Sequence, residues 1–193
     1  MQHKNINRGL ALLVGLLGLY ILVSPYIPLF AYQLHRGHYP TPAYVAAAQN
    51  DRVADTNIPN ENRIAIPKIG VDDPIIEGTS IATLDMGLWH RPQTPTPLEG
   101  GNTVIAGHRF SYNPRLDTPF YNLDKLVSGD EIFIAWDQKI ITYRVAEIKT
   151  VRPEQVEIEA NTKENQLTLY TCTPLWTNRY RLVVIAKQVG EIL

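Results

Sequence analysis

The stretch LTLYTCTPLWTNRYRL, residues 167–182, contains the single cysteine of the chain and two strand-like runs separated by a loop. Apolar and polar side chains alternate in the first run, which is typical of a β-strand. The alternation puts Leu167 and Leu169 on one face and Tyr170 and Cys172 on the other. A Thr-Pro pair follows Cys172, and proline cannot continue a strand ladder. We therefore predict a strand that ends at Cys172 and pairs with a second strand returning near residue 180.

Further strand-like runs occur from residue 61 onward. Ile, Val, Thr and Tyr predominate in them, and Gly, Pro, Asn or Asp bound them. The runs are RIAIP (63–67), PIIEG (74–78), NTVIAGH (102–108), DEIFIAW (130–136), KIITYRVAEIKTV (139–151), QLTLYTC (166–172) and YRLVVIAK (180–187). The short spacings leave little room for long crossover helices, so we predict an all-β antiparallel barrel or sandwich.

Two kinds of connection complete this prediction. The sequence Trp136-Asp137-Gln138 lies between two runs and indicates a β-hairpin. Two short helices are predicted around residues 81–89 and 119–126.

Length and charge limit the functions that the chain can have. Its 193 residues suit one ordinary domain with additional segments. A hydrophobic content of 45% is typical of a globular protein. The formal net charge of -1 gives no electrostatic basis for binding nucleic acid, so we exclude that class of partner.

Residues 9–30 contain no charged side chain. As a helix they would extend over about 33 Å, enough to cross a bilayer. Basic residues precede the segment, so we predict a transmembrane signal anchor with residues 1–8 in the cytoplasm and the rest outside. A cleavable signal peptide is the alternative, because Pro25 and Pro28 would end a helix early. We expect residues 31–60 to form an extracellular stalk, with one or two helical turns near residues 43–49, and residues 61–193 to form the main domain.

Three side chains suggest a catalytic site. Cys172 cannot form an internal disulfide, because the chain has no second cysteine. It is either a buried apolar group, an intermolecular bridge or a nucleophile. His108 follows an apolar strand directly after Gly107, and Arg181 should lie across a hairpin from Cys172. A thiolate, an imidazole and a guanidinium together provide the nucleophile, the acid and base, and the oxyanion donor of acyl transfer.

The cysteine segment TLYTC (168–172) resembles the TLxTC signature of sortases, membrane-anchored cysteine transpeptidases of mainly Gram-positive surfaces. Further blocks are similar to that family in the same order: IPKIGVDDPIIEGT (66–79), GLWHRPQTPTPLEGGNTVIAGHR (87–109), NLDKLVSGDEI (122–132) and TLYTCTPLWTNRYRLVV (168–184). The resemblance implies an eight-stranded β-barrel with one or two short helices. It also implies that Cys172, His108 and Arg181 are catalytic, while Arg179 and His90 are the rival arginine and histidine.

The same resemblance implies a reaction and its partners. Cys172 would attack the Thr carbonyl of an LPxTG-like sorting signal on a surface protein or pilin, and an amine of a cell-wall precursor or pilin lysine would resolve the thioester. No cofactor or metal ion is expected. A cysteine peptidase that uses water as the acceptor and an inactive barrel that binds peptide or cell-wall material are the alternatives.

An acidic segment before the last strand pair permits two interpretations. Some members of the family bind calcium through acidic loops, and Glu154, Glu157 and Glu159 could contribute oxygen ligands here. Because Ca²⁺ takes about six to eight ligands, we favour a solvated acidic loop. Val156 and Ile158, in the same segment, would either form the floor of an apolar peptide pocket or make ordinary core contacts.

Overall fold

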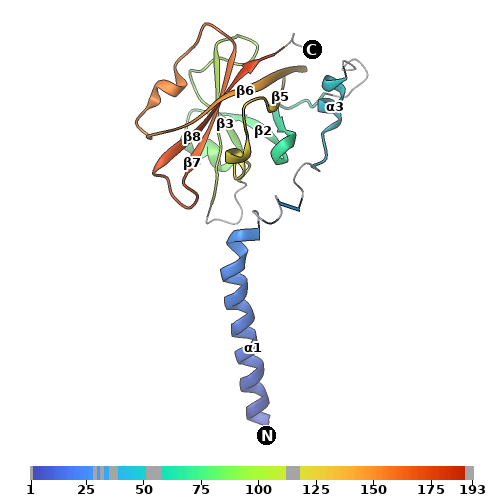
Figure 1. Ribbon diagram of the computed structural model, residues 1–193, viewed down its shortest axis with the longest axis vertical. Helices are drawn as coiled ribbons and strands as arrows, with labels where there is room; N and C mark the ends of the chain where they lie inside the picture. Colours follow the sequence, from blue (N-terminus) through green and yellow to red (C-terminus); the bar gives the residue numbers. More distant parts are fainter. Residues whose placement is uncertain are drawn as a thin grey trace. The chain divides into compact units, whose positions relative to one another are not determined.

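A computed structural model of the protein describes residues 2–27, 30, 33–34, 39–50, 58–111 and 118–189. The chain divides into two compact units, Met1–Arg36 and Gly37–Leu193. The first unit is mainly helical, and the second contains all the strands of the described residues (Figure 1).

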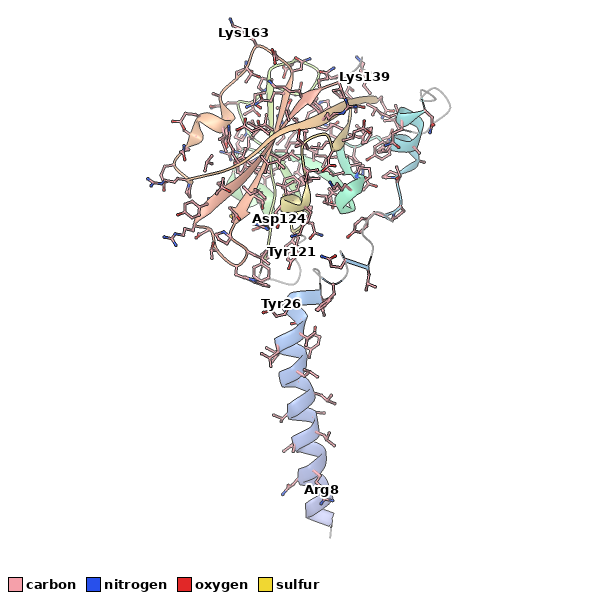
Figure 2. All side chains as sticks on the ribbon, viewed as in Figure 1. Arg8, Tyr26, Tyr121, Asp124, Lys139 and Lys163 are labelled. Atoms are coloured by element: carbon pink, nitrogen blue, oxygen red, sulfur yellow. The ribbon has the colours of Figure 1, made fainter. Side chains whose placement is uncertain are left out.

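The first unit contains the helix α1 (Gln2–Val23) and the short 3-10 helix η1 (Ser24–Tyr26). Its leucine side chains project from all around the helix and are exposed, for example Leu12 at 68% and Leu22 at 71% (Figure 2). A search of the described residues finds no helix with both the length and the apolar character needed to cross a membrane. The predicted anchor at residues 9–30 thus stays a prediction.

The second unit is a closed barrel of eight strands, in the order β1-β2-β3-β4-β7-β8-β6-β5 (Figure 1). This arrangement confirms the eight-stranded barrel implied by the family resemblance. The strands are β1 (Arg63–Ile66), β2 (Val71–Glu77), β3 (Leu88–His90), β4 (Asn102–Ala106), β5 (Glu131–Trp136), β6 (Lys139–Val151), β7 (Gln166–Thr173) and β8 (Tyr180–Gln188). The interior is filled by fully buried aliphatic side chains, including Ile64, Leu88, Ile105, Ile134 and Ile141.

Two strand pairs in the barrel are parallel, so the prediction of a purely antiparallel sheet is wrong. β2 pairs in parallel with β3, and β4 pairs in parallel with β7. The first crossover is made by the five-residue 3-10 helix η4 (Ile81–Asp85) and its flanking turns. The second is made by β5 and β6, which lie between β4 and β7 in sequence. Parallel pairs usually require a crossover, and here a 3-10 helix and a hairpin replace the long helix.

The connections agree in part with the prediction. A hairpin joins β5 to β6, and Asp137 and Gln138 take positive φ angles of 47° and 60° there. Left-handed conformations at both central residues characterise the type I′ turn. The predicted helix at 81–89 is shorter than expected, because η4 ends at Asp85 and β3 begins at Leu88. The one predicted at 119–126 is the single 3-10 turn η5 (Leu123–Lys125).

Helix α3 (Ala43–Gln49) packs on the barrel, although the sequence analysis places it in the stalk. Tyr44 and Val45 form a buried cluster with Phe133 and Ile140. The Tyr44 hydroxyl also donates to Asp72 Oδ1 over 2.9 Å. Residues 39–50 therefore belong with the barrel unit. Residues 31–32, 35–38 and 51–57 of the predicted stalk lie outside the described residues.

The buried hydroxyl of Tyr143 should make the barrel less stable at alkaline pH. Burial raises the pKa of Tyr143 to about 12, because the phenolate would lose its hydration. Above about pH 10 the unfolded chain releases this proton while the folded chain retains it, so the free energy of unfolding falls. We expect Tyr143 to contribute a loss of about 1 kcal/mol by about pH 11, so the free energy of unfolding of Tyr143→Phe should fall by that much less than that of the wild-type chain. Urea unfolding of both proteins between about pH 8 and about pH 11 measures it, and an equal fall in both would contradict the assignment.

Candidate active site

β7 lies between β4 and β8, and this arrangement brings the predicted site residues together. In the antiparallel pair, Cys172 lies directly opposite Arg181. In the parallel pair, Ala106 lies opposite Tyr170. His108 is two residues after Ala106, just beyond β4, and Cys172 is two residues after Tyr170, near the end of β7. The two residues therefore come to the same end of the sheet.

Hydrogen bonds extend the β4–β7 pairing beyond the last residue of β4. Gly107 N donates to Tyr170 O over 3.2 Å, and the Thr171 hydroxyl donates to Gly107 O over 2.7 Å. A side chain at position 107 has no room, because a Cβ atom there would lie 2.5 Å from Leu88 and 2.6 Å from Phe120. Glycine thus allows the close approach that places His108 at the end of β7.

A cavity of about 380 Å³ has Cys172, His108 and Arg181 in its walls. The sulfur is half-buried at the end of β7. Val156 and Ile158, from the 3-10 helix η6 (Val156–Glu159), line the same cavity. The two side chains therefore line a cavity, and its use as a peptide pocket stays a prediction. The cavity combines a thiol, an imidazole, a guanidinium and an apolar wall.

His108 is held on two sides. Its Nε2 lies 3.2 Å from Asp85 Oδ1, at the end of η4, and its backbone oxygen accepts a hydrogen bond from Phe120 N over 3.2 Å. Its side chain is 27% exposed. The Asp85 contact orients the imidazole ring. Sequence reasoning did not find Asp85, because one acidic residue in a short turn gives no local signal.

Arg181 is oriented by the loop between β7 and β8. Its Nη1 donates to Asn178 O over 3.0 Å and to Tyr180 O over 3.2 Å. The rival Arg179 is exposed, its guanidinium lies 5.6 Å from the centroid of the Tyr180 ring, and it is not among the residues that line the cavity. Of the two arginines, Arg181 is the one that lies opposite Cys172 in the strand pair and lines the cavity with it.

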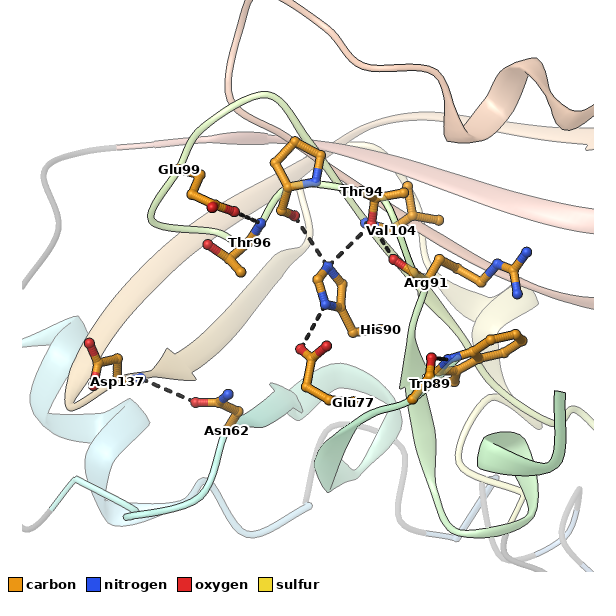
Figure 3. Close-up of polar contacts among 12 residues, drawn as sticks. Asn62, Glu77, Trp89, His90, Arg91, Thr94, Thr96, Glu99, Val104 and Asp137 are labelled. Carbon is orange, nitrogen blue, oxygen red and sulfur yellow. Dashed lines mark hydrogen bonds and ion pairs between the residues drawn. The ribbon is translucent and has the colours of Figure 1, made fainter. Parts of the chain in front are cut away.

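The rival histidine, His90, is a buried structural residue at the end of β3 (Figure 3). It is 4% exposed, its Nδ1 lies 2.7 Å from Glu77 Oε1, and its Nε2 lies 3.2 Å from Pro95 O. The Thr94 hydroxyl is also 3.2 Å from Nε2, and Trp136 packs edge-on against the ring. Protein groups thus surround both nitrogens.

A polar cluster forms another part of the cavity wall. Arg91 Nε lies 2.8 Å from Glu159 Oε1, and the Tyr170 hydroxyl donates to the same oxygen over 2.8 Å. The Arg91 guanidinium also stacks 4.0 Å above the centroid of Trp89. Burial, followed by the nearby Glu159 carboxylate, raises the pKa of Tyr170. Glu159 therefore forms an ion pair with Arg91. Among the described residues, no three metal-ligating side chains gather closely enough to hold an ion.

The segment that carries Val156 and Ile158 is fixed to β4 by Asn102. The Asn102 side-chain amide donates to Ile158 O over 3.0 Å and to Ala160 O over 2.9 Å. Asn102 N in turn donates to Asn161 Oδ1 over 3.0 Å. One buried amide thus holds the apolar cavity wall in place relative to the strand that leads to His108.

A second cavity, of about 340 Å³, shares the lining residues Cys172 and Asn178 with the first. Its walls include Cys172 and Arg109 together with the aromatic side chains of Phe110 and Trp176. These two rings pack edge to face, with centroids 4.0 Å apart. Cys172 thus lines both cavities.

The two histidines should differ in their effect on stability. His90→Ala removes a buried ring with hydrogen bonds at both nitrogens and is expected to lower the free energy of unfolding by about 2 to 3 kcal/mol. His108→Ala removes a partly exposed ring and should cost less than about 1 kcal/mol. Urea unfolding of both variants measures the difference. A larger loss for His108→Ala would contradict the structural role of His90.

Comparison with known proteins identifies the family. Residues 64–189 match the family model described as Sortase domain. Sortase SrtE1 of Streptomyces coelicolor is 34% identical over 65% of this chain and 39% of its own length, and Sortase D of Bacillus subtilis is 31% identical over 58% and 53%. The chain thus spans about half or less of either relative. Among solved structures, Streptococcus pneumoniae sortase C (TM-score 0.60, 30% identity, 70% of each chain) and Corynebacterium diphtheriae sortase A (TM-score 0.61, 32% identity, 82% of this chain and 74% of that one) are similar. With its eight-stranded barrel and its matched segment of residues 64–189, the chain belongs to the sortase family.

Proposed function

We propose that the chain is a cysteine transpeptidase that cleaves an LPxTG-like sorting signal between Thr and Gly and transfers the acyl part to an amine. The observation that carries this proposal is the convergence of Cys172, His108 and Arg181 on one cavity. The three groups have distinct tasks in acyl transfer, and no two of them perform all of these tasks.

In the first half of the reaction, the Cys172 thiolate attacks the carbonyl carbon of the scissile Thr–Gly bond. The carbonyl oxygen becomes negative and accepts hydrogen bonds from the Arg181 guanidinium. The C–N bond then breaks, and protonated His108 gives its proton to the departing amine. The product is a thioester between the Thr carbonyl and the sulfur.

In the second half, an amine attacks the thioester carbonyl. His108, now neutral, takes the proton that the amine loses, and the C–S bond breaks to return the Cys172 thiolate. The new bond is an amide, so the energy of the original peptide bond is conserved through the thioester. Because Cys172 borders two cavities, a second substrate has a route to the sulfur that the first does not fill.

The larger cavity suits a short extended peptide. Five extended residues span about 17 Å. Val156 and Ile158 offer apolar contact for the Leu-Pro part of the signal. The backbone N–H and C=O groups of the bound peptide would face the polar wall formed by the Arg91–Glu159 pair. The S. pneumoniae sortase C structure is described with pilin substrate specificity. We propose surface proteins or pilins with a C-terminal sorting signal as partners of this chain.

The test follows a fluorogenic LPxTG peptide incubated with the purified chain, with and without triglycine. We expect cleavage that the amine accelerates, and a peptide product extended by triglycine in mass spectra. Cys172→Ala should abolish both. Arg181→Lys keeps the charge but loses the planar donors, and it should lower the rate by about 100-fold or more.

Arg179→Lys is the matched control for Arg181→Lys and should keep wild-type activity, because Arg179 is exposed outside the cavity. Cleavage indifferent to the amine would indicate a peptidase that uses water. No cleavage, together with a Cys172 thiol that reacts with iodoacetamide only after denaturation, would indicate an inactive binding barrel.

We also propose that the chain is anchored in the cell membrane by residues 9–30, with the barrel outside. The uncharged sequence and the exposed leucines of α1 support this proposal. We expect the full chain to stay with membranes through an alkaline carbonate wash, whereas a chain that begins at residue 37 should be released. Fractionation and immunoblotting measure this, and release of the full chain by the wash would contradict anchoring.

A further inference from the structure

Arg109 is a buried guanidinium that joins three segments next to the site. It is 8% exposed. Its Nη1 donates to Thr173 Oγ1 over 2.8 Å, its Nη2 lies 3.0 Å from Asp124 Oδ2, and its Nε donates to Tyr121 O over 3.4 Å. Tyr121 and Asp124, labelled in Figure 2, belong to the segment around η5. The three contacts use both ends of the planar guanidinium fork.

The positions of these contacts relate them directly to catalysis. Arg109 follows His108 in the chain, and Thr173 follows Cys172. The Arg109–Thr173 bond therefore ties together the residues next to the imidazole and the thiol, beyond the last backbone pair of β4 and β7. The segment around η5 supports this junction twice, through Asp124 on Arg109 and through Phe120 N on His108 O.

A buried arginine at this place needs an explanation, because a cation taken out of water is costly unless it is paired. Asp124 compensates its charge. A lysine would compensate a carboxylate as well, but its single nitrogen cannot reach three acceptors in fixed directions. The three contacts of Arg109 thus depend on the planar shape of the guanidinium, as expected for a group that sets the distances between the segments it joins.

We propose that Arg109 is a positioning residue that, through Thr173 and Asp124, fixes the separation of the His108 imidazole and the Cys172 sulfur. We call Arg109, Thr173 and Asp124 the clamp. This proposal rests on the proposed transpeptidase function. Catalytic groups lose rate steeply when they move by a fraction of an ångström, so a loosened clamp should slow proton transfer between them.

Thr173 offers the sharpest test, because its hydroxyl can be removed without changing its shape. In the full-length chain, Thr173→Val should lower kcat for the LPxTG peptide by about 10-fold or more and leave KM within about twofold, because the peptide contacts are intact. Thr173→Ser keeps the hydroxyl and should keep most of the activity. Thr150→Val, on the exposed face of β6, is the matched control and should match wild type.

Arg109→Lys should resemble Thr173→Val, while Arg144→Lys should have no effect. Arg144 also pairs with a carboxylate, Glu131, but on the exposed surface of the barrel. Thermal unfolding of each variant shows whether it is folded. Thr173→Val removes no charge, so the comparison of this variant with wild type stays informative if Arg109→Lys fails to fold.

A second measurement needs no substrate. A nearby imidazole favours the reactive thiolate, so the rate of Cys172 alkylation by iodoacetamide reports how closely His108 accompanies it. We expect Thr173→Val to slow alkylation several-fold in the wild-type background and to have no further effect in a His108→Ala background. This non-additivity is the signature of action through His108, and a purely structural role would give additive effects.

The outcomes separate this proposal from the proposed function. Wild-type alkylation and kcat in Thr173→Val, equal losses in the Val and Ser variants, or additive effects with His108→Ala would each overturn the clamp. If the wild-type chain does not process the peptide, the proposed function fails, and the alkylation cycle still decides whether the clamp couples the two side chains.

Discussion

The pairing of β7 on both of its edges is the constraint on which the site depends. One edge of β7 runs parallel to β4 and the other runs antiparallel to β8. Cys172 near the end of β7, His108 just after β4 and Arg181 on β8 therefore come to the same end of the sheet. If either register shifted by one residue, a side chain of the site would turn to the opposite face of the sheet. The backbone ladder thus brings the parts of the chain that carry the thiol, the imidazole and the guanidinium to one end of the sheet, and side-chain contacts orient these groups there.

Buried polar side chains support this pairing on the face of the sheet that carries Tyr170 and Cys172, beneath the segment of η6. The Thr168 hydroxyl donates to Asn102 Oδ1 over 2.7 Å, and the Gln166 amide donates to the same oxygen over 3.2 Å. These contacts satisfy polar groups across the β4–β7 pair, where a slipped register would leave them buried without partners. The side-chain nitrogen of Asn102 donates to Ile158 O. Asn102 therefore links the register of the strands to the shape of the cavity.

Local patterns in the sequence predicted the long strands and the hairpin at Asp137–Gln138, because alternation and turn residues are local signals. They did not predict β3, which has only three residues, or the parallel pairs, which depend on how distant strands close the ring. At the site, the hairpin placed Arg181 opposite Cys172. The role of Arg109 was not visible, because its partner Thr173 is 64 residues away and no local pattern marks a buried arginine.

Closure of the barrel also limits how a peptide can be held. Every strand has a hydrogen-bonded neighbour on both sides, so no strand lies at an open edge of the sheet, although residues 145–151 of β6 have no strand partner on the β5 side. Many peptide-binding domains recognise an extended ligand by adding it to a sheet as one more strand, which makes affinity largely independent of side chains. The ring has no fully open strand for that mode, so a peptide bound as proposed would be recognised mainly by side chains and loops at the rim. Selectivity in such a fold can therefore diverge through loop substitutions while the ring itself stays unchanged.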